Sequence, residues 1–97
     1  MEIIKIYQGN LIDARELHTF LESKQDFSTW IKNRIRRYKF EEGTDYTSFH
    51  KIVEREKGGS KRNDYALTID MAKELAMVEN NERGRQARGI LLNVKKL

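Results

Sequence analysis

Cysteine and proline are both absent from this chain of 97 residues. Without cysteine the chain forms neither disulfides nor thiolate metal sites, which fits a reducing compartment. Histidine is scarce: His18 and His50 are far apart and lack the spacing of a metal-ligand motif, so we predict no metal site and no cofactor. The length fits one small domain, and the absence of proline fits a compact unit without rigid linkers.

Long apolar runs are missing as well. No segment is long and apolar enough to cross a membrane, and the N-terminal Met1–Lys5 lacks the architecture of a signal peptide. We therefore expect a cytoplasmic protein without a membrane partner. The formal net charge of +4 is only mildly basic, so the distribution of charge says more about partners than its total.

Acidic residues are missing from one long stretch, between Asp26 and Glu41. Apolar residues recur there at three- and four-residue steps, which predicts a helix capped by Asp26 and ending near Tyr38 or Lys39. Its remaining surface is cationic, which makes it a candidate recognition surface for nucleic acid or an acidic protein. A merely solvated basic face is an equally good interpretation. The apolar stripe is Phe27, Trp30, Ile31, Ile35 and Tyr38, and the cations are Lys32, Arg34, Arg36, Arg37 and Lys39.

The other elements follow from periodicity, capping residues and turn signals. Asp13 with Glu16 forms a pattern like a capping box, and residues 23–25 make a short connection to the basic helix. Two helices so joined resemble a helix-turn-helix pair. The whole pattern predicts a small, mainly helical α+β domain. Its elements are a strand within 2–7, a helix at 14–22, the basic helix, a β-hairpin of strands 46–56 and 62–68 around Lys57–Lys61, a helix from Thr68 or Asp70 to before Asn80, and a helix at 82–96.

The predicted hairpin has a basic tip with two glycines, like the wing of a winged helix-turn-helix domain. Glycines let a tip approach a nucleic-acid groove closely, and Lys61 and Arg62 would lie against phosphates. A plain solvated turn is the competing interpretation. Asn33 or Arg34 would reach a base edge. The candidate binding residues are Lys32, Asn33, Arg34, Arg36, Arg37, Lys39, Lys61, Arg62, Arg85 and Arg88.

The last predicted helix contains Gly84 and Gly89, which each weaken a helix by up to about 1 kcal/mol relative to alanine. We therefore expect it to dock on the domain itself or on a second copy of the chain. Arg85 and Arg88 lie one turn apart and are open to a partner, whereas Arg83 is expected to pair within the chain. The apolar stripe of this helix is Ala87, Ile90, Leu91 and Val94.

Signatures of catalysis are also missing. Lys57–Lys61 is too short for a phosphate-binding loop and lies between strands rather than before a helix. The acids at 41–45 lack the spacing of an EF-hand. Ser28, His50 and Asp64 have no nucleophile-elbow signature around them. We predict that the protein is not an enzyme.

Several sequence blocks occur in an order that is more specific than any one of them. The blocks are Asp13–His18, Phe20–Glu22, Asp26–Lys32, Tyr65–Thr68, Asp70–Met77 and Gly84–Arg88. Together they resemble the phage antirepressor domain of the AntA/AntB type, over about residues 11–92. The chain is also similar, more distantly, to the Bro-N and KilA-N domains of viral proteins, which are regarded as DNA-binding.

The resemblance implies a single domain over residues 1–97 with a core at about 11–92. It implies a phage or prophage protein of the bacterial cytoplasm that relieves lysogenic repression by binding a phage repressor protein, double-stranded DNA, or both. Two other interpretations stay open: a winged-helix-like transcription regulator without antirepressor activity, and a protein–protein or oligomerisation module that uses the 82–96 helix. Family members usually continue into a C-terminal region, so a fragment of a longer protein stays open too.

Overall fold

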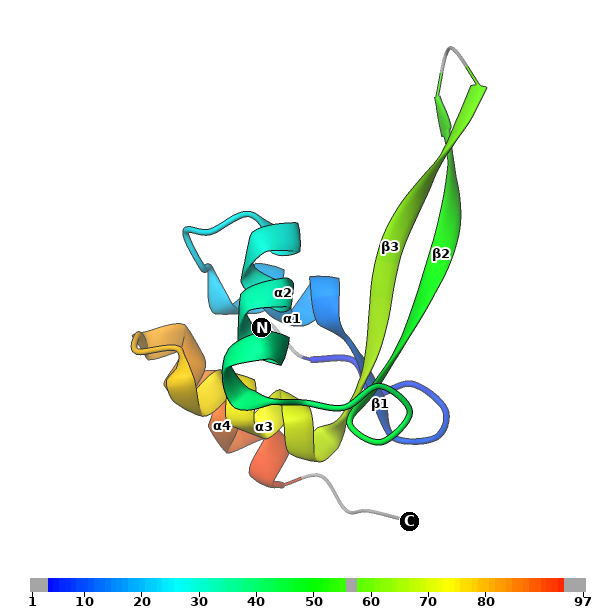
Figure 1. Ribbon diagram of the computed structural model, residues 1–97. Helices are drawn as coiled ribbons and strands as arrows, with labels where there is room; N and C mark the ends of the chain where they lie inside the picture. Colours follow the sequence, from blue (N-terminus) through cyan, green and yellow to red (C-terminus); the bar gives the residue numbers. More distant parts are fainter. Residues whose placement is uncertain (1–3, 56–57, 94–97) are drawn as a thin grey trace.

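The computed structural model describes residues 4–55 and 58–93, and within these the side chains of residues 4–50 and 62–93. It confirms the predicted α+β class (Figure 1). A body of helices stands beside a long β-hairpin, whose outer part projects beyond the helices. The described elements are β1 (Leu11–Asp13), α1 (Ala14–Leu21), α2 (Phe27–Tyr38), β2 (Tyr46–Arg55), β3 (Gly58–Thr68), α3 (Ile69–Val78) and α4 (Glu82–Leu92).

The three strands form an antiparallel sheet in the order β1-β3-β2. The short β1 pairs with the base of β3, and the β2–β3 ladder continues outward until Arg55 pairs with Gly58. The prediction that β3 begins at residue 62 was therefore wrong, because Gly58–Lys61 belongs to the strand. Glycine is disfavoured in strands because it has no side chain to pack. The backbones of Gly58 and Gly59 nevertheless pair with Arg55 and Glu54 of β2, as a continuation of the β2–β3 ladder.

The predicted strand within 2–7 was also wrong. Residues 4–6 are not in a strand, and Tyr7 makes only an isolated bridge to Leu11; residues 1–3 lie outside the described ones. The strand of this region is Leu11–Asp13, which the sequence analysis missed. Three residues are too few to show the alternation of apolar and polar side chains by which a strand is recognised in a sequence. This strand forms because it pairs with β3, which lies far along the chain.

Side-chain caps begin the predicted helices as the sequence indicates. Asp13 Oδ1 accepts from the backbone N–H groups of Arg15 and Glu16 at 2.8 and 3.2 Å. The Asp26 carboxylate accepts from the Thr29 N–H at 3.0 Å, and this bonding lowers the pKa of Asp26. Thr68, rather than Asp70, caps α3. Each cap satisfies a donor that the first helical turn leaves free, which fixes where the helix starts.

α4 docks on the domain itself. Its Ala87 and Leu91 are buried in the core with residues of α1 and α3, so they are not available to a second copy. Gly84 makes the approach possible, since a Cβ there would lie 2.3 Å from the Glu79 carbonyl oxygen and 2.7 Å from that of Ala76. α4 ends at Leu92 with Asn93 as its C-cap, short of the predicted end at residue 96. Val94, the end of the predicted stripe, is outside the described residues. None of the described helices is long and apolar enough to cross a membrane.

Candidate nucleic-acid interface

The buried side of α2 holds this helix against the rest of the domain. Trp30 is completely buried, and its indole Nε1 donates to Glu79 Oε1 at 3.1 Å. Arg34 Nη2 lies 3.4 Å from the same carboxylate oxygen. Both contacts tie α2 to the residue that ends α3. Arg34, predicted as a reader of base edges, therefore lies in a half-buried ion pair of the fold.

The other four predicted cations of this helix are exposed. Successive residues of an α-helix are turned by about 100°. Lys32 and Arg36, four residues apart, consequently lie on one side, whereas Arg37 is turned about 100° away from Arg36. Arg36 Nη2 donates to the Asn33 side-chain oxygen at 2.9 Å, which orients the guanidinium along the outer surface of α2. The basic helix thus has a preferred side.

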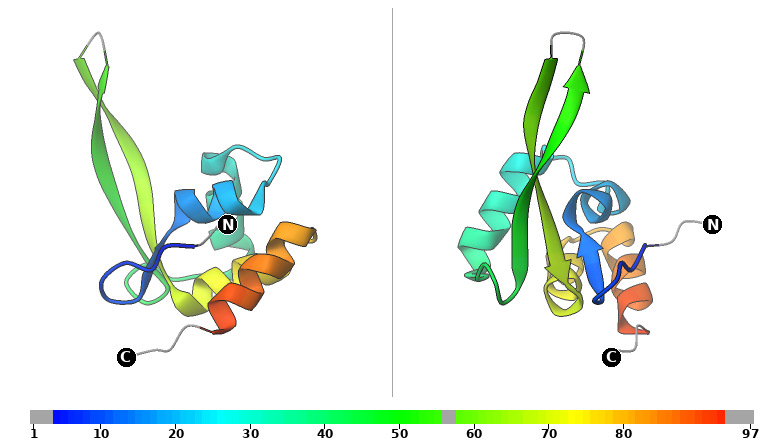
Figure 2. Two further views of the ribbon diagram at one scale, coloured as in Figure 1. Left: turned by 180° about the vertical axis from the view of Figure 1, so that it is seen from behind. Right: turned by 90° about the vertical axis from the view of Figure 1, so that its right-hand side faces the viewer.

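That preferred side faces the hairpin across a groove of about 310 Å³. In the right-hand view of Figure 2, α2 and α1 flank the β2–β3 hairpin, and the groove is lined by α2 and the hairpin. Lys32 and Arg36 line it from α2, and the exposed His50 and Asn63 line it from β2 and β3. The rest of the lining is Ile35, Glu42, Tyr46, Ser48 and Tyr65.

Glu42 is the one acid among the residues that line the groove. Its carboxylate accepts from the Ser48 hydroxyl at 2.5 Å and from the Ser48 N–H at 3.3 Å. These hydrogen bonds lower the pKa of Glu42, so it is ionised at neutral pH. Lys32 and Arg36 have no carboxylate partner among the described side chains. The groove therefore keeps an excess of positive charge.

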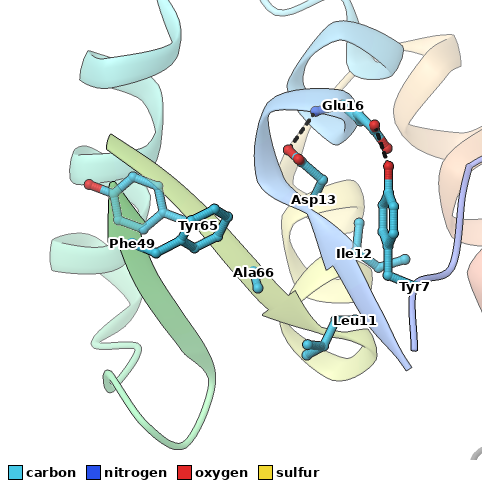
Figure 3. A pocket seen from close by; sticks show the side chains of 8 residues that line it. All are labelled: Tyr7, Leu11, Ile12, Asp13, Glu16, Phe49, Tyr65 and Ala66. Atoms are coloured by element: carbon cyan, nitrogen blue, oxygen red, sulfur yellow. Dashed lines mark hydrogen bonds between the residues drawn. The ribbon is translucent and has the colours of Figure 1, made fainter. Parts of the chain in front are cut away.

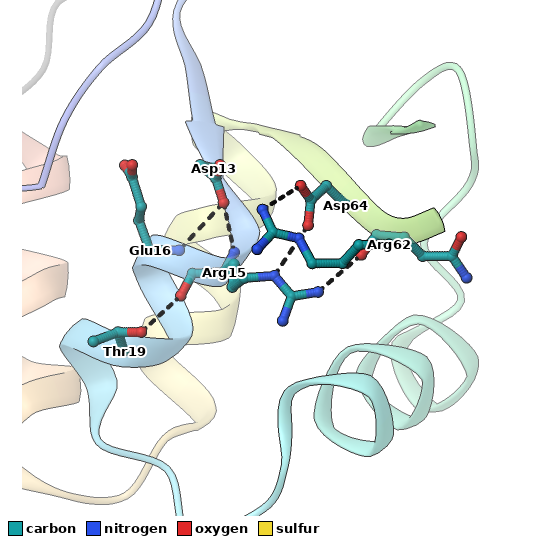
Figure 4. Close-up of polar contacts among 7 residues, drawn as sticks. Asp13, Arg15, Glu16, Thr19, Arg62 and Asp64 are labelled. Carbon is teal, nitrogen blue, oxygen red and sulfur yellow. Dashed lines mark hydrogen bonds and ion pairs between the residues drawn. The ribbon is translucent and has the colours of Figure 1, made fainter. Parts of the chain in front are cut away.

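The opposite face of the hairpin carries a closed network of charges (Figure 4). Asp64, which is fully buried, accepts from Arg15 Nε and from Arg62 Nη2, each at 3.0 Å. Burial alone would raise the pKa of Asp64, but the hydrogen bonds and charges of the two arginines outweigh it, and the pKa is lowered. Arg15 also donates to the Asn63 carbonyl oxygen at 3.0 Å and lies over the Phe27 ring. This network fastens β3 to α1.

Arg62, predicted to lie against phosphates, is therefore part of this network and not of the groove. Neighbouring side chains of a strand point to opposite faces, so Arg62 and Asn63 lie on different faces of β3. Lys61 belongs to β3 by its backbone, but its side chain lies outside the described ones. His50, Ser48 and Asn63 were not predicted to bind. These three residues lie on one face of the hairpin because side chains alternate between the two faces of a strand. The sequence shows this alternation within each strand, but the pairing register is needed to place the residues of both strands on the same face.

A model of one protein family matches residues 12–81, and that family is described as AntA/AntB antirepressor. The chain belongs to the AntA/AntB antirepressor family. Comparison with curated proteins and with solved structures gives no match. The match to the antirepressor family confirms the resemblance to the AntA/AntB domain over residues 12–81, and the Gly84–Arg88 block lies outside the matched span. That span contains α2, the groove and the whole described part of the hairpin.

α4 lies beyond the span that matches the antirepressor family. Its Arg85 and Arg88 are exposed and line a separate depression of about 180 Å³ at the junction of α3 and α4. Arg85 Nη1 is 3.6 Å from Glu82. Arg83 pairs within the chain as expected, since its Nε donates to the Phe20 carbonyl oxygen at 2.9 Å. The structure thus does not bring Arg85 and Arg88 into the groove beside α2.

Proposed function

We propose that this antirepressor domain acts by binding duplex DNA with α2 and the β2–β3 hairpin. One phosphate backbone lies in the groove between them, and α2 faces the adjoining major groove. The observation that carries the proposal is the pair Lys32 and Arg36, which are exposed, uncompensated by a described carboxylate and opposed across the groove by polar side chains. Neutralising phosphates and releasing their counterions supplies most of the affinity of such surfaces.

The dimensions support this arrangement. α2 has 12 residues and is therefore about 18 Å long, and the major groove of B-DNA, about 12 Å wide, admits an α-helix. Lys32, Arg36 and Lys39 contact phosphates. Asn33, which already accepts from Arg36, is the polar side chain of α2 placed to reach a base edge. Arg34 and Arg62 act in the fold and make no phosphate contact in this arrangement.

A repressor protein with an acidic patch is the rival partner for the same surface. Tight protein interfaces use aromatic anchors at their centre, and on α2 an exposed Trp30 or Tyr38 would supply one. Trp30 is fully buried and hydrogen-bonded to Glu79, so it offers no surface to a partner. Tyr38, which is 38% exposed, is the one aromatic side chain of α2 left at the surface. The geometry therefore favours DNA over an acidic protein.

A salt titration with a fluorescent random-sequence duplex tests the proposal. We expect binding at about 50 mM salt that weakens as salt rises, with a slope of log K against log salt of about −0.9 for each phosphate neutralised. Three cations give a slope of about −2.7. Absence of binding at the low salt concentration would overturn the proposal. Capture of the repressor of the same phage, surviving nuclease treatment, would assign the surface to protein instead.

Arg36→Ala and Arg37→Ala are a matched pair that tests the side of α2. Both remove one exposed cation from adjacent positions of the same helix. We expect Arg36→Ala to lower duplex affinity roughly tenfold and to flatten the salt slope by about 0.9, because it removes a charged contact to phosphate. Arg37→Ala should leave both values nearly unchanged. Equal losses in the two variants would contradict the groove arrangement while leaving DNA binding itself intact.

A further inference from the structure

A second cavity, of about 300 Å³, is lined by residues of β1, α1 and the hairpin (Figure 3). Ala66, one of these residues, shares a face of β3 with Arg62 and Asp64, because alternate side chains of a strand point to the same side. Leu11 and Ala66 line its apolar interior. Tyr7 and Phe49 line it from two different segments and are unusually exposed for aromatic residues, at 43% and 38%. Exposed aromatic walls around a cavity are typical of a surface that binds a partner.

This cavity and the basic groove lie on different faces of the sheet. Phe49 stands between Ser48 and His50 in β2, and side chains alternate between the faces of a strand. Phe49 and Ala66 therefore face away from the side on which Lys32 and Arg36 lie. Tyr65, which is buried, lines both, and an occupant of the cavity and a duplex in the groove otherwise meet different side chains.

The charge of the cavity is negative. Its acids are Asp13 and Glu16, and no Lys, Arg or His lines it. Asp13 is engaged in capping α1, whereas Glu16 accepts only from the Tyr7 hydroxyl, at 2.6 Å, among the described groups. This hydrogen bond is the main cause that raises the pKa of Tyr7 to about 12, so the tyrosine keeps its proton.

The adjacent cation does not neutralise Glu16. Arg15 directly precedes Glu16 in the chain, but its guanidinium is held by Asp64 and the Asn63 carbonyl oxygen and lies over the Phe27 ring. A carboxylate with two oxygens accepts about four hydrogen bonds, so Glu16 retains capacity beyond the one from Tyr7. The mouth of an apolar, aromatic-walled cavity thus carries a carboxylate without a described cationic partner.

We propose that this cavity binds an arginine side chain of a partner protein. The aliphatic part of the arginine lies against Leu11 and Ala66, its guanidinium donates to Glu16, and the rings of Tyr7 and Phe49 flank it. Charge complementarity selects this occupant, because a carboxylate at the mouth repels phosphate and attracts a guanidinium. The inference is independent of DNA binding, since it uses none of the groove residues.

Amide NMR with short blocked peptides tests the inference on the folded chain. Acetyl-Ala-Arg-Ala-amide is titrated into the ¹⁵N-labelled protein, and acetyl-Ala-citrulline-Ala-amide serves as its uncharged isostere. We expect saturable shifts of the amides of Tyr7, Glu16 and Phe49 with the arginine peptide, at dissociation constants of about 1 mM. The citrulline peptide should bind at least about threefold more weakly. Absence of shifts at these amides, or equal binding of both peptides, would overturn the inference.

Glu16→Gln and Glu74→Gln are the matched variants, since both replace an exposed glutamate on a helix and only the first lines the cavity. Glu16→Gln should abolish the preference for arginine over citrulline, and Glu74→Gln should leave it unchanged. Arg36→Ala should also leave it unchanged while weakening duplex binding, which separates this inference from the proposed function. Shifts of the same amides that depend on protein concentration without peptide would assign the cavity to a second copy and overturn the proposal.

Discussion

Arg62 and Asn63 are neighbours on β3, yet they lie on faces of the hairpin that differ in charge. On the face of Arg62, the buried Asp64 holds two arginines, and the adjoining cavity is lined by acids alone among its charged residues. On the face of Asn63, Lys32 and Arg36 outnumber the single acid Glu42. Arg15 and Arg62 are thus paired with Asp64, whereas Lys32 and Arg36 have no carboxylate partner among the described side chains.

The two faces of the hairpin are also expected to differ in what they contribute: one to the stability of the fold and the other to binding. Leaving a buried charge without its partner is costly, so the Asp64 network is expected to hold β3 on α1. Exposed cations beside a groove contribute little to folding, because surface charges are solvated in both states. Substitutions on the two faces should therefore affect different measurements.

The largest effect should come from Asp64→Asn. This change removes the charge that two arginines share, so we expect the free energy of unfolding to fall by about 2–3 kcal/mol. Urea unfolding measures it. Asp70→Asn on the exposed side of α3 is the control and should change the value by less than about 0.5 kcal/mol. Similar losses in both variants would break the comparison between the faces.

Acidification should act on the same face, with a smaller effect. Because the pKa of Asp64 is lowered in the folded protein, its ion pairs stabilise the fold above the ordinary carboxylate range and lose this contribution as the pH falls through the folded pKa. The stability difference between the unsubstituted chain and Asp64→Asn should thus shrink between pH 7 and pH 3. A difference that is constant over this range would contradict the role of the charge.

Arg62→Ala and Asn63→Ala should have crossed effects. The Arg62 side chain is 40% exposed, so its loss should lower the free energy of unfolding by about 1 kcal/mol or less, with little change in duplex affinity. Asn63→Ala should lower duplex affinity about two- to threefold and leave urea unfolding nearly unchanged. A larger loss of duplex affinity for Arg62→Ala than for Asn63→Ala would reverse the assignment of the faces.

The smallest effect, and one of opposite sign, is expected for Glu42→Gln. Removal of the one acid in the lining of the groove should raise duplex affinity about twofold, while the amide oxygen still accepts from Ser48. Glu41→Gln, which changes the same net charge outside the groove lining, should have a weaker effect. The two variants can be compared in one anisotropy series at low salt. Weaker binding of Glu42→Gln would count against a phosphate in the groove.

The helices could be predicted from the sequence because their signals are local. Asp13, Asp26 and Thr68 cap their helices with side chains that reach only two or three residues along the chain. The strand errors have the opposite cause. β1 was missed and the start of β3 was predicted too late, because strand pairing depends on partners far away in sequence, such as Leu11 with Thr68.

The candidate site was likewise predicted only where its signals are local in the sequence. The basic character of α2 is visible in the sequence, and its exposed cations Lys32, Arg36, Arg37 and Lys39 are where the periodicity puts them. The sequence could not show that Arg34 meets Glu79, 45 residues away. Nor could it show which residues of the hairpin face α2, because a one-residue change of register exchanges the two faces.

The sequence by itself determined the family, the presence of four helices and the concentration of positive charge on one of them, since each of these rests on residue identity and short spacing. The tertiary structure alone decided which cations remain available. Carboxylates from distant segments bind Arg15 and Arg34, and Asp64, two residues along β3, binds Arg62. No carboxylate of the described residues reaches Lys32 or Arg36. An ion pair depends on a distance of a few ångströms in space, and the fold brings together charges that the chain keeps far apart.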